Sequence, residues 1–162
     1  MADYGVPDDP EGLLSWSWAA ERLAGNKNFW LVTVDGRGRP HAMPVWGWWD
    51  DTAGRFWFSC AVGAAKVRHL EANPHTTVMT DDTVEVVSIR GRAEVVDTSA
   101  PSDELRAAAA AWGARYENDD ATAEQFAEFF VSANVFCVTP VEAFSIIERP
   151  DEFGPCATRW RW

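Results

Sequence analysis

The sequence predicts a mainly β protein with flanking helices, an α+β fold built on antiparallel strands. Between residues 29 and 60, runs rich in aromatic and β-branched residues alternate with short runs of glycine, aspartate and arginine. This order is typical of consecutive antiparallel hairpins. Alanine-rich or amphipathic segments stand on both sides of these runs, and their apolar residues recur at helical spacing.

Three strands are expected in the first half of the chain. They are Phe29–Val34, Pro40–Trp49 and Arg55–Cys60, with turn residues at Asp35–Gly38 and Asp50–Gly54. Pro40 and Pro44 share one parity of the second strand, and proline has no N–H to donate to a ladder. We therefore expect this strand to have one side unpaired or bulged near Pro44, which frees backbone groups for a ligand. The alternative is an ordinary edge strand.

Four further strands are expected in the second half. They are His75–Asp81, Val84–Val96, Val135–Thr139 and Ala143–Ile147, the last two separated by Pro140. Along residues 84–96 small or apolar residues alternate with polar ones, so one strand face should lie in the core. Arg90 and Arg92 share the other face. One interpretation is that these arginines mark a changed subunit interface or a changed substrate-binding end. The other is that they lie on a solvated strand face, where Glu94 offsets their charge.

Four helices are also expected, and the tail from Pro150 reads as a loop ending in a short docked strand. The helices span Leu13–Ala24, about Gly63–Asn73, Ser102–Tyr116 and Ala123–Phe130. Ser102 is suited to cap the third helix. Trp112 and Tyr116 belong to an apolar stripe that is typical of a core, and they are weak candidates for a substrate pocket.

Length and charge limit the class of protein. We expect a single domain over residues 15–162, after a loose acidic segment 1–14. The formal net charge of -11 argues against a nucleic-acid or anionic-membrane partner, because phosphates bind clustered Lys and Arg. No apolar run approaches the roughly 20 residues of a membrane helix, and the start lacks a signal-peptide pattern. The expectation is a soluble cytoplasmic protein.

The metal-binding and disulfide patterns are absent from the sequence. The cysteines are Cys60, Cys137 and Cys156, and the histidines are His41, His69 and His75. None has the spacing of a zinc site or a disulfide framework. Buried free thiols are the simplest interpretation of the cysteines.

A lysine lies in the first turn of the short basic helix near residues 63–73. Unpaired N–H groups and the helix dipole favour an anion at such a turn, so Lys66 suggests a phosphate site. Val67 and Leu70 should face inward, while Lys66, about 100° round the helix from Val67, can reach a cleft or solvent.

The order of these motifs resembles the flavin and deazaflavin oxidoreductases of the pyridoxamine 5'-phosphate oxidase-like family. The matching residues are Gly38, Arg39, Pro40, His41, Pro44, Val45 and Trp46, then Phe56, Phe58 and Ser59, then Lys66, Arg68, Leu70, Asn73 and Pro74. The resemblance extends to the closing A-T-R-W-R-W and covers about Ser15–Trp162. It implies a split β-barrel of the FMN-binding type, and a homodimer with the cofactor cleft at the subunit interface.

The resemblance also implies which residues bind the cofactor. They are Lys66 and Arg68 at the phosphate, Ser59 and Cys60 at the polar edge, Pro44, Val45 and Trp46 along the ring, and Arg159 and Trp160 from the tail, often of the other chain. The chain departs from its relatives at Ala64 and Ala65, where they carry Ser or Thr and, in the oxidases themselves, Arg. Losing one charge-assisted hydrogen bond costs about 1.5–3 kcal/mol, so binding could weaken about tenfold or more unless another arginine compensates.

The ten tryptophans have two interpretations. They can fill a barrel core and a subunit interface, where aromatic rings bury much area. Alternatively, Trp46 or Trp160 lies against a planar ligand.

The function expected from these features is that of a cofactor-dependent oxidoreductase. No nucleophile–base motif and no dinucleotide-binding glycine motif occurs, so the bound ring would perform the chemistry and no catalytic side chain can be named. The expected reaction passes a hydride from coenzyme F420, or from FMN, to a small unsaturated or quinone-like molecule. F420 is favoured because richness in arginine and alanine suits a GC-rich genome, where the deazaflavin branch is common.

Two other functions remain open from the sequence. One is a flavin- or deazaflavin-binding carrier without turnover, which the thinned phosphate site would suit. The other is a haem-binding barrel, for which His41, His69 and His75 are the available axial ligands.

Overall fold

Residues 11–162 form seven strands and five helices in the computed structural model, which describes this part of the chain. The strands are β1 (Asn28–Val34), β2 (Pro40–Asp50), β3 (Arg55–Cys60), β4 (His75–Thr80), β5 (Glu85–Val95), β6 (Asn134–Ile147) and β7 (Thr158–Arg161). The helices are α1 (Trp16–Gly25), α2 (Ala65–Ala72), α3 (Asp103–Tyr116), α4 (Ala123–Val131) and the single turn α5 (Phe153–Cys156). The first ten residues of the expected loose segment lie outside the described residues.

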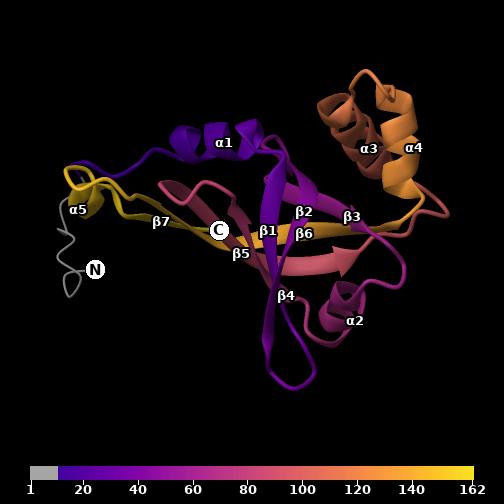
Figure 1. Cartoon of the computed structure of the whole chain (residues 1–162), viewed down its shortest axis with the longest axis horizontal. Helices are drawn as coiled ribbons and strands as arrows, with labels where there is room; N and C mark the ends of the chain where they lie inside the picture. The colour runs from indigo at the N-terminus through magenta and orange to yellow at the C-terminus, as the bar shows by residue number, and fades with distance from the viewer. Residues whose placement is uncertain (1–10) are drawn as a thin grey trace.

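Strands β1 to β6 close into an antiparallel barrel. The strand order is β3-β2-β1-β4-β5-β6, and a pairing between β3 and β6 completes the ring (Figure 1). Closure satisfies strand edges that an open sheet would expose. Strand β7 pairs with the far end of β6 and extends the sheet beyond the barrel. The predicted fold class, mainly β with flanking helices and an antiparallel barrel, is confirmed.

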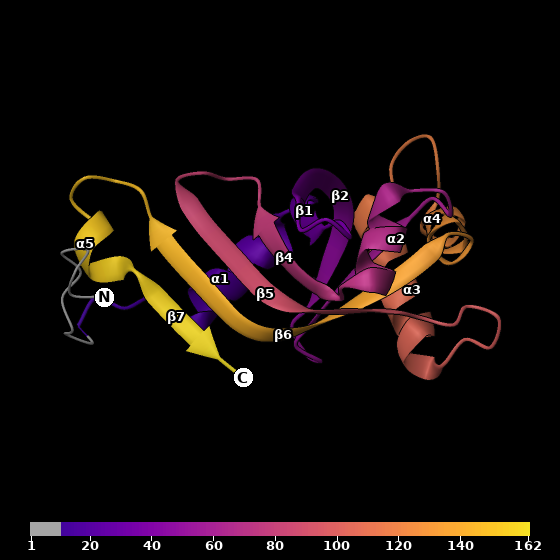
Figure 2. The ribbon, with the colours of Figure 1, turned by 90° about the horizontal axis from the view of Figure 1, so that it is seen from below.

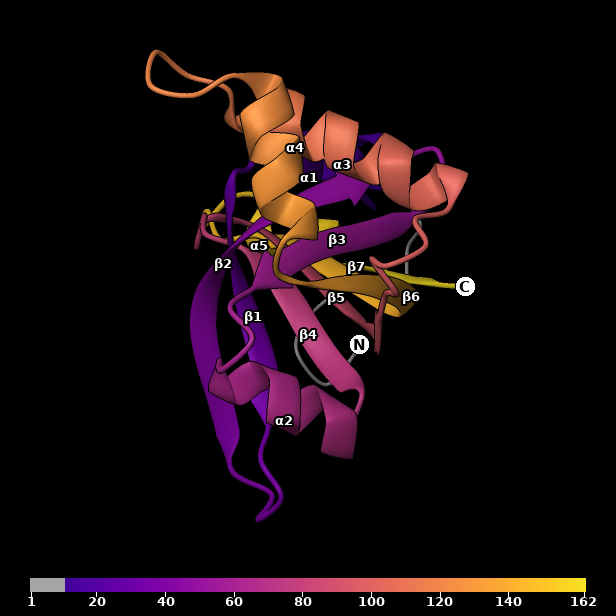
Figure 3. The same cartoon turned by 90° about the vertical axis from the view of Figure 1, so that its right-hand side faces the viewer.

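The helices lie at separate places around this barrel. Helix α2 packs on β1, whereas α3 packs on β2 and α4 on β3 and β6. Figure 3 shows the α3–α4 pair at one end of the barrel and α2 toward the other. The α3–α4 segment leaves the sheet after β5 and returns at β6, and these two points are joined because Val96 N–H donates to the Val135 carbonyl at 2.9 Å.

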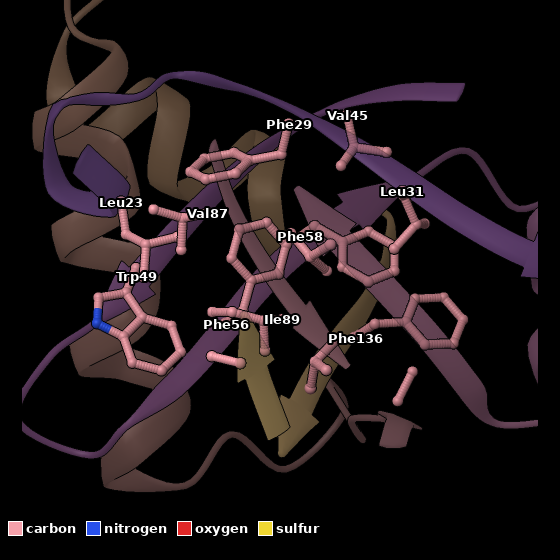
Figure 4. Close-up of a cluster of buried hydrophobic side chains, with 14 of the residues drawn as sticks. Leu23, Phe29, Leu31, Val45, Trp49, Phe56, Phe58, Val87, Ile89 and Phe136 are labelled. Carbon is pink, nitrogen blue, oxygen red and sulfur yellow. The ribbon is translucent and has the colours of Figure 1, made fainter. Parts of the chain in front are cut away.

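Two apolar clusters hold these layers together. The barrel interior contains four closely packed phenylalanine rings, shown in Figure 4: Phe29, Phe56, Phe58 and Phe136. A second cluster lies beneath the helical pair, where Trp57 of β3 contacts the buried faces of α3 and α4, including Trp112 and Phe130. Full burial of such rings stabilises the fold by about 1.5–3 kcal/mol each. The apolar stripe predicted for α3 is therefore confirmed as core.

Helix α1 begins three residues later than predicted. Ser15 is its N-cap and accepts a hydrogen bond from the Trp18 N–H, so the helix starts at Trp16 and not at Leu13. The preceding Leu14 N–H instead donates to the Thr158 hydroxyl oxygen at 2.8 Å. This contact ties the entry of the helix to β7, the short strand expected at the tail.

The prediction of two strands around Pro140 was wrong, because β6 is continuous from Asn134 to Ile147. A register shift absorbs the proline: Arg90 pairs with Glu142 and Gly91 with Pro140, which leaves Val141 as an extra residue. Gly91 makes this possible, since a Cβ atom there would lie 2.5 Å from the Thr139 carbonyl oxygen.

We expect Gly91→Ala to lower the free energy of unfolding by about 1–3 kcal/mol, because the added methyl group overpacks the bulge. Urea unfolding measures the change. Gly36→Ala is the matched control, since no atom lies within 4 Å of a Cβ built at that position. Equal midpoints for the two variants would contradict this account of the bulge.

Candidate functional site

Strand β2 has one side without a strand partner where a ligand site was expected. Its residues from Pro40 to Trp46 pair with β1, and only Gly47 to Asp50 pair with β3. Beyond Phe58, strand β3 pairs with β6 and no longer with β2. The expected unpaired side near Pro44 is confirmed, and it arises from divergence of two strands without a bulge in β2.

Pro44, Val45 and Trp46, the three residues of this segment that were predicted to contact the cofactor ring, would present different groups to a ligand. Val45 is buried in the barrel core, so only its backbone can meet a ligand. Pro44 is exposed, and Trp46 points to the opposite side from Val45, with 48% of its surface exposed. The segment therefore offers backbone atoms and one indole ring.

Helix α2 has an uncapped N-terminus. Side-chain hydroxyls of Ser15, Ser102 and Thr122 cap α1, α3 and α4, whereas the N-cap of α2 is Ala64, which makes no side-chain hydrogen bond. The first N–H groups of α2 are thus left for solvent or an anion.

Lys66 and Cys60 lie in the same region. Lys66 is half-buried, while Val67 and Leu70 of the same helix are buried against the barrel, as predicted. Burial raises the pKa of the Cys60 thiol, and the nearby charge of Lys66 opposes that rise. Cys60 is therefore a neutral thiol at neutral pH. Ser59 is half-buried and precedes Cys60 on β3, but successive strand residues point to opposite faces, so Cys60 and Lys66 are the predicted site residues shown near one another here.

Tyr116 fixes the place where β2 and β3 diverge. Its hydroxyl accepts the Gly47 N–H at 2.8 Å and lies 2.5 Å from the Lys27 carbonyl oxygen, to which it donates. Burial raises the pKa of Tyr116 to about 12, although the Gly47 contact opposes the rise. Its ring stacks on Trp46 with centroids 5.0 Å apart. The sequence indicated its apolar stripe but gave no sign of its hydroxyl's role.

Arg159 and Trp160, the two site residues predicted near the C-terminus, lie in a different part of the fold from Lys66. Arg159 is 3.5 Å from Glu142, and Trp160 packs edge-on against Trp16 with ring centroids 5.4 Å apart. Figures 1 and 2 both show β7 on the opposite side of the molecule from α2. Within one chain, Arg159 and Trp160 therefore do not join Lys66. Their part in a cofactor site stays a prediction that requires a second chain.

A charged cluster lies on the outer face of β5, β6 and β7. Burial acts to raise the pKa of Glu142, but hydrogen bonds from Arg90 and Arg161 outweigh it, so the pKa is lowered. Arg90 is thus paired with Glu142, and Glu94 lies 3.6 Å from Arg92. Arg90, Glu142 and Arg161 line a pocket of about 580 Å³ that also contains His75 and Trp162.

The other two histidines contact one another. Their rings are 4.6 Å apart; His41 lies 3.3 Å from an Asp35 oxygen, and His69 Nδ1 lies 3.0 Å from the Thr33 hydroxyl. Over residues 11–162, no group of three or more acidic, histidine or cysteine side chains is arranged to hold a metal ion. In the same part of the chain, no helix has the length and apolar character needed to cross a bilayer.

Comparison with known proteins gives the family. The family model described as "Pyridoxamine 5'-phosphate oxidase" matches residues 18–145. The chain belongs to this family. Its matched segment contains Lys66, the divergent end of β2 and the whole α3–α4 pair, whereas β7 lies outside it. The resemblance expected from the sequence is confirmed. A search of curated proteins finds no match.

Several solved structures share the fold of this oxidase-family chain. A conserved hypothetical protein of Mycobacterium tuberculosis has a TM-score of 0.68 at 19% identity, over 84% of this chain and 86% of that one. An F420 reductase has a TM-score of 0.54 at 22% identity, over 76% and 94%. The haem storage protein HutZ of Vibrio cholerae has a TM-score of 0.60 at 19% identity, over 75% and 87%. At these identities the likeness shows the fold alone.

We expect Tyr116→Phe to lower the free energy of unfolding by about 1–3 kcal/mol, since the buried Gly47 N–H loses its acceptor. Chemical denaturation measures the effect. Thr52→Val, which removes a hydroxyl group from the exposed β2–β3 turn, should change stability far less. If both variants unfold at the same denaturant concentration, the Tyr116 hydroxyl does not anchor β2.

Proposed function

We propose that this protein is an oxidoreductase that transfers a hydride between a bound deazaflavin, coenzyme F420, or FMN and a small organic acceptor. The observation that carries the proposal is the uncapped N-terminus of α2, with half-buried Lys66, beside the unpaired edge of β2. The cofactor has a phosphate joined by a short chain to a flat ring. The N-terminus of α2 with Lys66 would suit the phosphate, and the unpaired edge of β2 would suit the ring. F420 is the favoured cofactor.

The residues present fit the phosphate end of such a cofactor. Free N–H groups at the start of α2 and the Lys66 ammonium group both favour an anion, although Ala64 offers no hydroxyl group to donate to it. Exposed Arg68 lies on the same helix and can add a second cation. Ser59 would donate a hydrogen bond to the cofactor's polar edge.

The residues along β2 fit the ring. Pro44, Val45 and Trp46 pair with β1 on one side of β2 and have no strand partner on the other side in the described part of the chain, so backbone groups on that other side are available to a planar polar edge. When bound, the ring supplies the hydride chemistry. The protein would hold and orient it, while the neutral thiol of Cys60 adds no charge beside it.

We also propose that the protein acts in the cytoplasm as a homodimer with the cofactor cleft at the subunit interface. Large apolar side chains on β1 and β2 support this, because Trp30 and Met43 are exposed in the single chain. A second copy would bring its own Arg159 and Trp160 toward the site, in keeping with the role that the family resemblance implies for this tail.

We expect Lys66→Ala to weaken binding of F420 or FMN about tenfold or more, because it removes a charge-assisted contact to phosphate. Titration of the purified protein, followed by cofactor absorption and tryptophan quenching, measures the affinity. Arg106→Ala removes the same charge from the exposed side of α3 and should leave affinity unchanged.

Turnover is tested with the same protein. Oxidation of the reduced cofactor should speed up when an acceptor is added, whereas a carrier would bind the cofactor and leave that rate unchanged. If neither cofactor binds below about 100 μM, equivalent to roughly 5.5 kcal/mol, the proposed function is wrong.

Haem binding is the second candidate function. The observation that favours it is the pocket of about 580 Å³ in which His75 accompanies Arg90 and Arg161. An imidazole can ligate haem iron, and guanidinium groups suit the propionates. The fold shared with a haem storage protein supports the same candidate.

If this second function holds, haemin should produce a shifted Soret band that His75→Ala abolishes. His41→Ala is the control, because His41 lies beside Asp35 in the β1–β2 hairpin and does not line the pocket. Identical spectra for the wild-type protein and both variants would exclude His75 as the iron ligand.

A further inference from the structure

An apolar pocket lies between β2 and α4, outside the residues proposed to hold the phosphate. Its volume is about 360 Å³, and it is lined by Trp46, Ala121, Gln125, Phe126 and Phe129. This volume is at the lower end of the range for small-molecule sites. Phe129 is 56% exposed, which is unusual for a phenylalanine unless the ring meets a ligand or a partner.

The lining offers little to a polar ligand. Two lining side chains can form hydrogen bonds, through the indole N–H of Trp46 and the amide of Gln125, and the amide oxygen of Gln125 already accepts the Thr122 N–H at 2.9 Å in the capping box of α4. The remaining side chains are two phenyl rings and one methyl group. A ligand held here must gain its affinity from apolar contact and ring stacking.

One ring of the aromatic wall, Trp46, belongs to a longer stack. Trp46 lies parallel to Tyr116, with an interplanar angle of 13°, and Tyr116 in turn contacts Trp112 at 4.3 Å between centroids. The Gly47 N–H of β2 donates to the Tyr116 hydroxyl, which holds Tyr116 in this arrangement. A flat ring placed in the pocket would lengthen an existing stack without a cost for ordering flexible side chains.

The surroundings of the pocket disfavour an anion. Acidic residues precede and follow its lining residues on the loop and on α4: Glu117, Asp119, Asp120, Glu124 and Glu128, all exposed. No positively charged side chain lines the pocket among the described residues. Like charge would repel an anionic ligand.

We propose that this pocket binds the acceptor as a neutral, planar aromatic molecule of one or two fused rings. The proposal rests on the proposed function, because Trp46 belongs both to the pocket and to the segment of β2 expected to meet the cofactor ring. The acceptor carries a conjugated C=O group, as in a quinone: its ring system takes the hydride from the reduced F420 or FMN, and its oxygen takes a proton from water. The reduced cofactor releases its own proton to water and returns to its oxidised form, so two electrons and two protons are transferred in all.

Direct binding tests the pocket without relying on turnover. Calorimetric titration of the full-length protein without added cofactor should detect 2-naphthol, which is neutral at pH 7, and should detect 2-naphthalenesulfonate at least about tenfold more weakly. Phe129→Ser should weaken 2-naphthol binding about tenfold, because it removes one wall. Val95→Ser changes an equally exposed apolar residue on β5 and should have no effect.

A second variant keeps the test valid if Phe129→Ser disturbs the helical pair. Gln125→Glu retains an acceptor for the capping box and adds a negative charge beside the pocket. It should weaken 2-naphthol binding and abolish that of the sulfonate. Lys66→Ala should alter neither, so failure of the phosphate assignment remains distinguishable from failure of this pocket.

Three results would overturn the proposal. The first is absence of 2-naphthol binding to the wild-type protein while F420 or FMN still binds. The second is equal affinity for the neutral and the anionic probe. The third is a change in molar mass by light scattering when Phe129 is replaced by serine, since that would make the exposed ring part of an interface between two copies.

Discussion

The site depends on the separation of β2 from β3 at Gly47. One edge of β3 pairs with β2 only from Arg55 to Phe58, while its other edge pairs with β6 and closes the barrel, so β2 has no neighbour on this side over the residues before Gly47. Tyr116 stabilises the separation by bonding the backbone of Gly47 and of Lys27 at once. Gly47 itself leaves room for a ring of the core, since a Cβ atom there would lie 2.1 Å from Phe56. Core packing at Gly47 and the Tyr116 hydroxyl group thereby hold the unpaired edge of β2 in place.

Most of the fold could be predicted because its signals are local. Alternation along residues 84–96 and the proline spacing in β2 follow from the pleat, and these elements occur where they were expected. The first of the two errors has a local cause and the second a distant one. The start of α1 depends on the choice between Leu13 and Ser15, and continuity of β6 through Pro140 depends on Gly91, far away in sequence, which lacks a side chain.

The candidate site was predictable only in part, for a related reason. Lys66, Cys60 and β2 are near in sequence and joined by tight turns, so their spacing indicated that they would meet. The role of the Tyr116 hydroxyl arises from contacts across 69 and 89 residues, and no motif marks it. Arg159 and Trp160 depend on how a second chain would sit, which the spacing of residues in one chain does not determine.

The junction between Val96 and Val135 gives the helical pair an unusual independence. The segment that contains α3 and α4 leaves the barrel at Val96 and returns at Val135, and these two residues are hydrogen-bonded to each other. Its length and sequence can therefore change without altering the register of any barrel strand. The pair packs on the barrel through a second apolar cluster, which includes Trp57 of β3 and is separate from the barrel interior. Exchange of this segment would therefore change the lining of the pocket at Trp46 and leave the pairing of the barrel strands unchanged.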